Sequence, residues 1–505
     1  MGHGLDPDGL TPLMDMVLGF LYLSLPTPPV STSSSLSAAD DVTGDDRISL
    51  LPDDLLRAVV SRLPAKDGAR TALLSSRWRR IWLSAPLVLV DAHLLPPAAG
   101  GGESGRRRPP RAGAASRAVA DAVTRVLDSH PGPFPFVSLT CCFIDNDADH
   151  LAVAARWLDR LAAAGVEELV LVNRPYPIPG VRLPAELFRC GSSLRRLYIG
   201  AWELPDTAAI AVAAEFPNLK DLVLGCVVMM DPHGRDIPLL LAASPVLETL
   251  SVFGILNTLR VRLSSSSLRC AQFCLSLTEE VAVVDAPRLE RLFLWSNLRD
   301  TRVRIGHAPQ LRMLGYLQPG VHVLEIGNTI IKERTKVNPR TIVPAVNMLA
   351  LHLRFGVWNE VKMLPSFLRC FPNVETLCVE SSEGPESTNK IGVKFWQKDG
   401  LIECVQSHLK MIVFREFQGE QSEVSFLKYI AENARVLEKM VIVMKIGRYS
   451  APMELVAKMR GLESAKWASG GNKLGFLLSR LRSGGTAWGL KAGMDLSYDD
   501  PFMCL

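Results

Sequence analysis

The sequence lacks the short motifs that mark common catalytic and metal sites. It has no GxSxG, HExxH, Walker loop or kinase signature, and its nine histidines are not spaced as metal ligands. Residues 145–149, DNDAD, alternate acids as calcium loops do, but they lack the central glycine and distal glutamate of an EF-hand, so we expect a solvated loop. The sequence therefore predicts no catalytic residue, no metal and no cofactor. An enzyme whose site has no sequence motif remains an alternative.

Paired cysteines, excess charge and a long apolar run are absent as well. The ten cysteines include no CxxC pair, which indicates reduced thiols in the cytosol or nucleus. A net charge of +4 over 505 residues is too small to predict nucleic-acid binding. The apolar stretch 13–25 is too short to span a bilayer, and Asp15 interrupts it. We therefore predict a cytoplasmic and/or nuclear protein that binds neither nucleic acid nor membrane.

The sequence does contain an internal repeat, a hexamer of the pattern apolar-x-x-apolar-x-apolar. Its copies start 21 to 35 residues apart, the range in which solenoids stack one strand and one connecting segment per unit. Alternation along a strand predicts that the last two apolar residues point inward and that the residue between them points to a concave face. Clear copies begin at Phe134, Val166, Leu194, Leu219, Leu247, Leu289, Val346 and Val374, and weaker ones at Leu268, Leu311, Leu409 and Leu437.

Proline precedes several of these hexamers by two residues. It ends the preceding segment, so the repeats are punctuated as well as periodic. This favours a repeat over the alternative, in which the hexamers are separate strands of an ordinary α/β domain. The pattern resembles degenerate leucine-rich repeats. The prolines are Pro217, Pro245, Pro287, Pro309 and Pro372.

Three short helices are predicted before the repeats. Pro52, followed by two aspartates, begins the first helix, and Pro64 ends it. We expect Asp67 to cap the second helix, and Ser75 or Ser76 to cap the third. Helices this short cannot bury all their leucines among themselves, so the remaining apolar surface predicts a partner. The alternative is an ordinary helical hairpin whose leucines form its core.

This segment resembles the F-box of plant F-box proteins. The resemblance rests on Ile48, Leu51-Pro52, Leu55-Leu56, Leu63-Pro64, Arg70-Thr71, Leu74-Ser75 and Arg77-Trp78-Arg79. Family members usually have a β-branched residue before the Arg-Thr pair, whereas this chain has Gly68-Ala69, and we expect the glycine to loosen the second helix by up to about 1 kcal/mol. The resemblance implies docking onto the Skp-type adaptor of a cullin-RING ubiquitin ligase through Ile48, Leu51, Pro52, Leu55, Leu56, Leu74 and Trp78.

From residue 401 onward the sequence resembles the FBD region that closes many plant F-box proteins with degenerate repeats. The pattern predicts a strand over residues 409–417, a helix from 422 or 423 to 434, and a strand over 437–444. This order matches a longer final repeat, which would cap the open end of a solenoid.

Together these patterns predict an α/β chain with a small all-α F-box, an irregular leucine-rich-repeat solenoid of parallel strands with convex helices or loops, and an FBD-like strand-helix-strand region. A helix over 116–129 is expected to cap the first repeat. The predicted parts are a disordered, variable or locally packed extension (1–45), the F-box (46–86), a Pro/Gly/Arg-rich linker (87–115), the solenoid (116–395), the FBD-like region (396–465) and a C-terminal tail (466–505).

The resemblance implies a substrate-recognition subunit of a Skp-cullin-F-box ubiquitin ligase. The F-box would bind the adaptor, the repeats would bind a target protein, and the chain itself would catalyse no bond chemistry. A leucine-rich-repeat scaffold outside any ligase is the alternative. The candidate target-binding residues are the outward positions Glu168, Tyr198, Val223, Ser251, Phe293, Ala350 and Cys378.

Overall fold

The structure is a computed structural model. It describes residues 7–31, 48–95, 114–173, 180–206, 208, 215–231, 233–295, 300–382, 395–396, 400–445, 462, 465–471, 474–479 and 489–502. The chain forms two compact units, one of residues 1–247 and 254–257 and the other of residues 248–253 and 258–505. The arginine cluster of the predicted linker lies outside the described residues.

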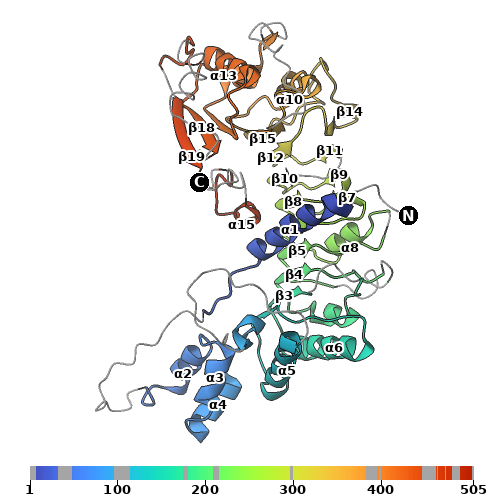
Figure 1. Cartoon of the computed structure of the whole chain (residues 1–505), viewed down its shortest axis with the longest axis vertical. Coiled ribbons are helices and arrows are strands. Elements are labelled where there is room, and N and C mark those ends of the chain that lie inside the picture. The colour runs from blue at the N-terminus through green and yellow to red at the C-terminus, as the bar shows by residue number, and fades with distance from the viewer. Residues whose placement is uncertain are drawn as a thin grey trace. The chain divides into compact units, whose positions relative to one another are not determined.

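The first unit contains the three predicted short helices, α2 (Asp53–Val60), α3 (Ala65–Thr71) and α4 (Ser76–Ser84) (Figure 1). The prediction for α4 is confirmed, because Ser75 Oγ accepts a hydrogen bond from the Trp78 amide. The prediction for α3 is wrong by three residues. Pro64, with a φ of −54°, already starts that helix. Asp67 therefore lies inside the first turn, where its carboxylate pairs with Arg70 at 2.9 Å.

Gly68 lets α3 approach α4 closely. It is buried, and a Cβ built on it would lie only 2.6 Å from Cζ3 of Trp82. No side chain fits in that space without movement of the Trp82 ring. The glycine therefore has a packing role that the comparison of its sequence with the F-box pattern did not reveal.

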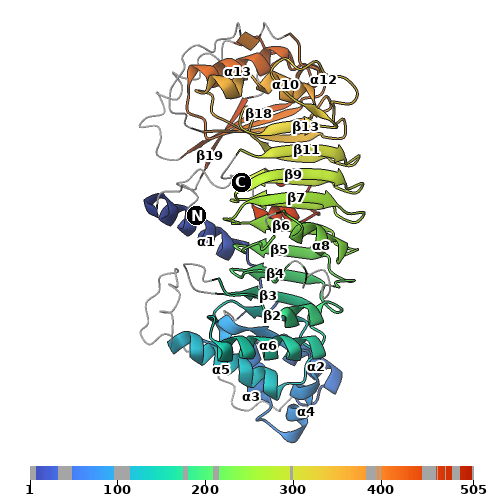
Figure 2. The ribbon, with the colours of Figure 1, turned by 90° about the vertical axis from the view of Figure 1, so that its right-hand side faces the viewer.

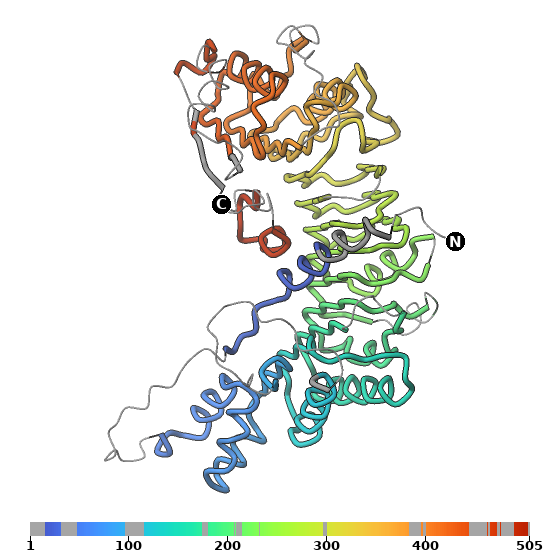
Figure 3. Tube along the Cα trace, in the orientation of Figure 1, coloured from blue at the N-terminus to red at the C-terminus, as the bar shows by residue number. Residues whose placement is uncertain are grey.

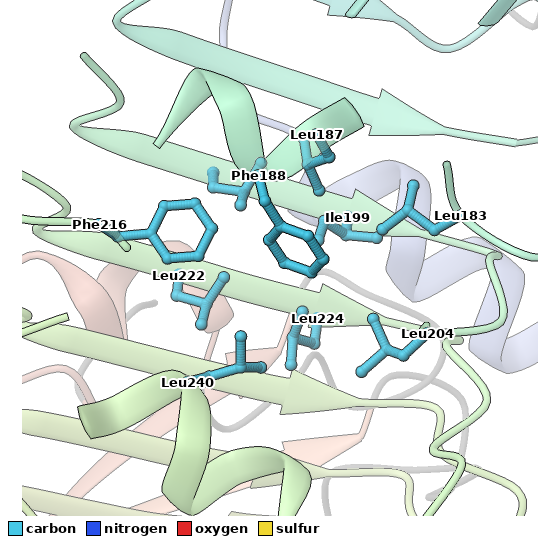
Figure 4. Close-up of a pocket in the computed structure, with 10 residues that line it drawn as sticks. Leu183, Leu187, Phe188, Ile199, Leu204, Phe216, Leu222, Leu224 and Leu240 are labelled. Carbon is cyan, nitrogen blue, oxygen red and sulfur yellow. The ribbon is translucent and has the colours of Figure 1, made fainter. Parts of the chain in front are cut away.

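The strands of the first unit pair in parallel in chain order, as the hexamers predicted. Helices and a 3₁₀ turn follow them on one face. Figure 4 shows this core, where Ile199, Leu222 and Leu224 point toward Phe188 and Leu240. The strands are β1 (Val88–Val90), β2 (Phe136–Leu139), β3 (Glu168–Val172), β4 (Arg196–Gly200) and β5 (Asp221–Gly225), and the other elements are α5 (Ala114–Ser129), α6 (Ala148–Ala163), η2 (Ala185–Cys190) and α8 (Asp236–Ala242).

Strand β1 and the short turn η1 (Asp91–Leu94) occupy the start of the segment predicted as a linker. The three β1 residues are buried and pair with β2. The buried Asp91 carboxylate also accepts hydrogen bonds from the amides of Thr140 and Cys141, at 2.7 and 2.6 Å. Residues 88–91 thus belong to the sheet region, because the strand pairs with β2 and Asp91 binds the segment that follows β2. The prediction that a linker begins at residue 87 is therefore wrong.

The N-terminal extension contains a helix, α1 (Pro7–Ser24). Val17 and Leu21 are four residues apart on one side of it, and both are buried. Of the descriptions that the sequence left open for residues 1–45, local packing therefore applies to this helix, and disorder does not.

The second unit has a parallel sheet formed by the remaining hexamers and by one further strand, β19. Every clear and weak copy in this part of the chain becomes a strand, as predicted. The strands of this sheet lie side by side in chain order. In the first repeats of the unit, however, every second strand of the chain belongs to another sheet. The strands are β6 (Thr249–Phe253), β8 (Cys270–Cys274), β10 (Arg291–Trp295), β12 (Met313–Leu317), β15 (Met348–Leu353), β16 (Thr376–Ser381), β17 (Met411–Arg415), β18 (Lys439–Lys445) and β19 (Leu474–Ser479).

A second, smaller sheet takes the place of convex helices in the early repeats of this unit. Figure 2 shows β7, β9, β11 and β13 stacked in one layer. They pair in parallel, and β14 adds an antiparallel edge. Burial alternates residue by residue along β7, so one face packs on the core and the other is solvated. The strands are β7 (Leu259–Ser264), β9 (Thr278–Asp285), β11 (Arg302–His307), β13 (Val323–Ile326) and β14 (Thr329–Ile330).

Helices return toward the end of the second unit, in the predicted strand-helix-strand order. Helix α13 (Gln421–Asn433) lies between β17 and β18 in the chain, and a capping box of Glu420 and Glu423 starts it. The predicted C-terminal tail is partly ordered, because it supplies β19 and α15 (Leu490–Met494). The other helices of this unit are α9 (Trp358–Val361), α10 (Leu364–Arg369) and α12 (Glu403–Ser407).

Candidate functional site

Helix α2 has one buried face and one apolar face that is open to solvent. Leu56 and Val60, one turn apart, are 0% and 1% exposed and form its core side. Leu55 and Val59 repeat the same spacing one residue earlier, yet they are 52% and 45% exposed. A surface helix normally places its apolar residues on one side only. The second apolar stripe of α2 is therefore a candidate contact surface.

The turn into α4 and the segment before α2 also carry exposed apolar side chains. Leu73 and Leu74 are 86% and 66% exposed in the turn, and Ile48 and Leu50 are exposed before α2. We call Ile48, Leu50, Leu55, Val59, Leu73 and Leu74 the F-box apolar surface. Burying six such side chains against a partner removes far more apolar area than isolated exposed leucines do.

Arg77 holds the segment before α2 against α4. Its guanidinium donates to the carbonyl oxygens of Ser49 and Leu51, in the second case at 2.7 Å, and pairs with the Asp53 carboxylate at 2.7 Å. Trp78 Nε1 donates to Ser49 Oγ at 3.4 Å. These bonds fix the backbone that carries Ile48 and Leu50. Arg77 was not predicted as a positioning residue, although it lies within the F-box pattern of the sequence.

The structure places the predicted adaptor-binding residues in two groups. Ile48, Pro52, Leu55 and Leu74 are exposed, and Leu51 is half-buried. Leu56 and Trp78 are buried within the three-helix module. Their side chains stabilise the module that presents the surface, and they are not themselves accessible. Leu50, Val59 and Leu73 belong to the surface but were missed. The exposure of Val59 follows from the phase of α2, which the leucine pattern alone does not fix.

The predicted outward positions of the hexamers lie side by side across neighbouring strands. Leu222 and Leu224 line the core, so Val223 between them points to the opposite face. We call these opposite-facing residues the central row. In the first unit the row is Val170, Tyr198 and Val223, and in the second it is Ser251, Gln272, Phe293 and Gly315, followed by Ala350, Cys378, Val413 and Val441.

Glu168 lies two residues before Val170, at the beginning of β3. Its carboxylate pairs with Arg196 at 3.0 Å, and the same guanidinium pairs with Asp221 at 3.1 Å. The three side chains are partly exposed and form a short row of charges. Surface pairs of this kind stabilise a fold only weakly. Glu168 is thus accessible, but it belongs to this charged row and not to the central row.

The central-row residues named as candidates are buried, not solvent-exposed. Tyr198 is 2% exposed, and Ser251 and Phe293 are 0% exposed. In the first unit, α1 covers the row. The Tyr198 hydroxyl donates to the Leu21 carbonyl oxygen at 3.1 Å and lies 2.6 Å from Ser24 Oγ. Burial raises the pKa of Tyr198 above its ordinary value, so the hydroxyl stays protonated and available as a donor.

Two glycines show how closely α1 packs on this face. A Cβ built on Gly254 would lie 2.6 Å from Val17 Cγ1, and one built on Gly200 would lie 3.1 Å from Leu21 Cδ1. Gly254 also has a φ of +67°, a backbone conformation that other residues rarely adopt. The first unit therefore has α1 as a fitted cover over part of its central row.

In the second unit the segment of residues 489–502 covers the row (Figure 3). We call this segment the C-terminal strap. The Phe293 ring packs edge-on against Phe502, with centroids 5.3 Å apart, and Tyr316 does so at 5.5 Å. Gln272 Nε2 donates to the Leu490 carbonyl oxygen at 3.4 Å. The sequence analysis missed Gln272, although it occupies the outward position of the weak hexamer that begins at Leu268.

Several buried ionisable groups of the repeat region have shifted pKa values. Burial, together with the nearby Glu416 carboxylate, raises the pKa of Glu380 to about 7. Burial also raises the pKa of the thiols of Cys190, Cys370 and Cys404 to about 12. A thiol with such a pKa is a poor nucleophile at neutral pH. No disulfide joins any two of the nine cysteines that lie in the described residues.

Within the residues that the structure describes, no helix is both long enough and apolar enough to cross a membrane. Over the same ranges, no group of three or more His, Cys, Asp or Glu side chains is placed to hold a metal ion.

Comparison with known protein families matches three parts of the chain. A model described as F-box domain matches residues 48–89, one described as FBD-associated F-box protein At5g56370, LRR repeats, matches residues 154–379, and one described as FBD matches residues 397–442. The first match contains the F-box apolar surface, and the second contains most of the central row. The third contains β17 and α13.

Curated proteins from Arabidopsis thaliana are similar along most of the chain. F-box/FBD/LRR-repeat protein At5g22660 is 24% identical over 437 residues, covering 79% of this chain and 89% of its own length. F-box/LRR-repeat protein 13 is 24% identical over 441 residues, with 79% and 89% covered. FBD-associated F-box protein At4g13985 is 24% identical over 461 residues, with 84% and 95% covered. The chain therefore carries matches to an F-box, leucine-rich repeats and an FBD in this order, and along most of its length it is similar to F-box/FBD/LRR-repeat proteins of Arabidopsis thaliana.

Proposed function

We propose that this protein is the substrate-recognition subunit of a Skp-cullin-F-box ubiquitin ligase in the cytoplasm and/or nucleus. Its F-box binds the Skp-type adaptor, and its repeat region binds the protein to be ubiquitinated. The observation that carries the proposal is the F-box apolar surface, on which Leu55, Val59, Leu73 and Leu74 are exposed within a module of only three short helices.

A surface of this kind is costly for a chain that acts alone. Exposed apolar patches on soluble chains mark contact or aggregation sites, and burying each leucine side chain contributes about 1.5–3 kcal/mol. Four hydrogen bonds or ion pairs from Arg77 and Trp78 hold the segment before α2 in place. The surface is thus preorganised, which lowers the entropy that binding costs.

In this proposal the chain contributes to ubiquitin transfer by placement. Adaptor and cullin hold the charged conjugating enzyme, and the repeat region holds a target so that its lysines lie near the thioester. The gain is an increase in effective concentration and needs no reactive group on this chain. The raised thiol pKa values in the repeat region support a non-catalytic role.

The test is capture of purified Skp-type adaptor by the full chain and by two matched variants. Leu74 in the F-box and Leu401 in the second unit are each 66% exposed, so Leu74→Asp and Leu401→Asp change the same amount of apolar surface. We expect adaptor binding by the unmodified chain and by Leu401→Asp, and a loss of at least about a hundredfold in affinity for Leu74→Asp.

Circular dichroism and thermal unfolding of each variant will show that the fold is intact. An unmodified, folded chain that does not bind the adaptor would refute the ligase role and leave a repeat scaffold. Equal adaptor binding by Leu74→Asp and the unmodified chain would show that the F-box apolar surface is not the docking site.

A further inference from the structure

The C-terminal strap is held mainly through its backbone. The Arg291 guanidinium, on β10, donates to the carbonyl oxygens of Gly493, Asp495, Leu496 and Tyr498, at 3.1 Å for Gly493 and 2.9 Å for Asp495. Carbonyl oxygens are present in every peptide, so this contact recognises an extended or turning chain and not one particular sequence.

A second arginine and a glutamine extend the same mode of contact. Arg415 Nη2, on β17, donates to the Phe502 carbonyl oxygen at 2.8 Å, and Gln272 donates to that of Leu490. Arg291, Arg415 and Gln272 are all buried beneath the strap. This face thus carries two buried guanidinium groups, with the Glu380 carboxyl near Arg415, and the strap carries three aspartates against one lysine.

One side chain of the strap is deeply buried. Phe502 is 0% exposed and lies against Phe293 and Tyr316, whose rings meet it edge-on. Aromatic anchors in such pockets dominate the affinity of peptide contacts. Tyr498, four residues earlier, is 51% exposed, so the strap does not use every aromatic residue it has.

The fit of the strap leaves polar groups of this face unsatisfied. Gln272 Oε1, Arg415 Nε and Ser251 Oγ are buried and have no hydrogen-bond partner among the residues that the structure describes. The strap forms no hydrogen bond with these three atoms. A segment of a partner protein that supplies donors and acceptors there would form hydrogen bonds with this face that the strap does not form.

We propose that this face of the second unit is a docking groove for an extended, acidic segment of a partner protein with a phenylalanine anchor, and that residues 489–502 fill it in cis until such a segment displaces them. The inference rests on the proposed function, since it names the kind of target segment that the receptor takes. Phe293 and Tyr316 bind the anchor, and Arg291 and Arg415 bind backbone carbonyl oxygens beside it.

The probe for the test is a fluorescein-labelled synthetic peptide with the sequence of residues 489–502, GLKAGMDLSYDDPF. In the full chain the strap competes with it at high effective concentration. Phe502→Ala removes the anchor of the strap but leaves the groove unchanged. By fluorescence anisotropy we therefore expect the peptide to bind this variant at least about tenfold more tightly than the unmodified chain.

Matched second substitutions locate the binding site. In the Phe502→Ala background, adding Arg291→Ala should weaken peptide binding at least about tenfold, whereas Arg340→Ala, at an exposed arginine of the same unit, should leave it unchanged. Arg291→Lys keeps the charge but loses the forked geometry, and we expect it to rescue binding only in part. A labelled peptide with alanine in place of its phenylalanine should bind none of the variants.

Hydrogen exchange on the unmodified chain gives a measurement that depends on no variant. Saturating unlabelled peptide should speed the exchange of amides in 489–502, because the displaced strap becomes free. If Phe502→Ala lowers the melting temperature but takes up no peptide, the strap is a structural cap and the inference is overturned. Equal peptide binding by the Arg291→Ala and Arg340→Ala chains would overturn it as well.

The same variants are tested for adaptor capture, which keeps the two proposals separate. A chain that binds the peptide but not the adaptor refutes the ligase role alone. A chain that binds the adaptor but not the peptide refutes the docking groove alone.

Discussion

Replacing Gly68 with alanine should destabilise α3, although the same change stabilises most helices. An interior Gly→Ala change gains about 1 kcal/mol in helix propensity. Here the new Cβ would lie 2.6 Å from Trp82 Cζ3, closer than side-chain carbons approach in folded proteins. Overpacking of this kind typically costs about 1–3 kcal/mol. The net expectation is a destabilisation of up to about 2 kcal/mol.

The larger cost applies only if the Trp82 ring cannot move away. That ring is buried and meets His130 edge-on, with centroids 4.7 Å apart. His130 Nε2 donates to the Trp82 carbonyl oxygen at 2.9 Å, while its Nδ1 accepts from the Gly132 amide at 3.0 Å. This arrangement requires the neutral imidazole, and burial lowers the pKa of His130 in agreement. Trp82 is therefore held on both its ring and its backbone.

Amide hydrogen exchange is the suitable assay, because a chain of two units has no single free energy of unfolding. A local loss of up to about 2 kcal/mol would speed exchange of the α3 amides up to roughly 30-fold. Gly19→Ala is the matched control, since Gly19 lies inside α1 and a Cβ built there has no heavy atom within 4 Å. We expect that control to slow α1 exchange up to about fivefold. If Gly68→Ala slowed α3 exchange to a similar degree, the packing argument would be wrong.

Three further predictions concern buried polar groups. Tyr198→Phe removes a hydroxyl that contacts Leu21 and Ser24, so it should lower the free energy of local opening of α1 by about 0.5–1.5 kcal/mol. Unchanged hydrogen exchange of the α1 amides would contradict this. Asp91→Ala leaves two amides without their acceptor, which costs about 1–3 kcal/mol of stability for each amide. It should therefore lower the urea midpoint of the first unit. The control Asp54→Ala, at an exposed aspartate of the same unit, should leave that midpoint unchanged. Burial lowers the pKa of His352 from 6.5 to about 4, so the folded chain binds fewer protons than the unfolded one and stability is lost as the pH falls through that window. The urea midpoint of the second unit should therefore fall between pH 7 and pH 5, and His352→Gln should reduce this fall by the equivalent of up to about 2 kcal/mol. An unchanged fall would show that His352 is not the group responsible.

Most of the strand order followed from the sequence, because each hexamer carries its own signal. The period-2 alternation that buries Leu222 and Leu224 also places Val223 on the other face, whatever lies there. The second sheet in the early repeats of the second unit had no such signal. Strand β7 reads Leu-Arg-Val-Arg-Leu-Ser, a short alternating run that lies in a connecting segment and repeats at no fixed phase.

The segments that cover the central row could not be predicted from the sequence. The contacts that bury Tyr198 and Phe293 join residues some 177 and 209 positions apart, and no local pattern encodes such pairs. The F-box apolar surface shows a smaller failure of the same kind. Leu55 and Leu56 are adjacent and chemically identical, and only the phase of α2 against α4 decides that one is exposed and the other buried.

A face that the chain itself fills changes how affinity for a target should be measured. If the C-terminal strap leaves the groove open in only a fraction of molecules, the apparent Kd of a partner segment rises by the inverse of that fraction. A groove open in one molecule of a hundred would turn a 10 nM site into one of about 1 μM. Weak binding by the unmodified chain therefore does not show that the groove is the wrong site. The decisive comparison is between chains that differ only at Phe502, since that side chain anchors the strap but forms no part of the groove.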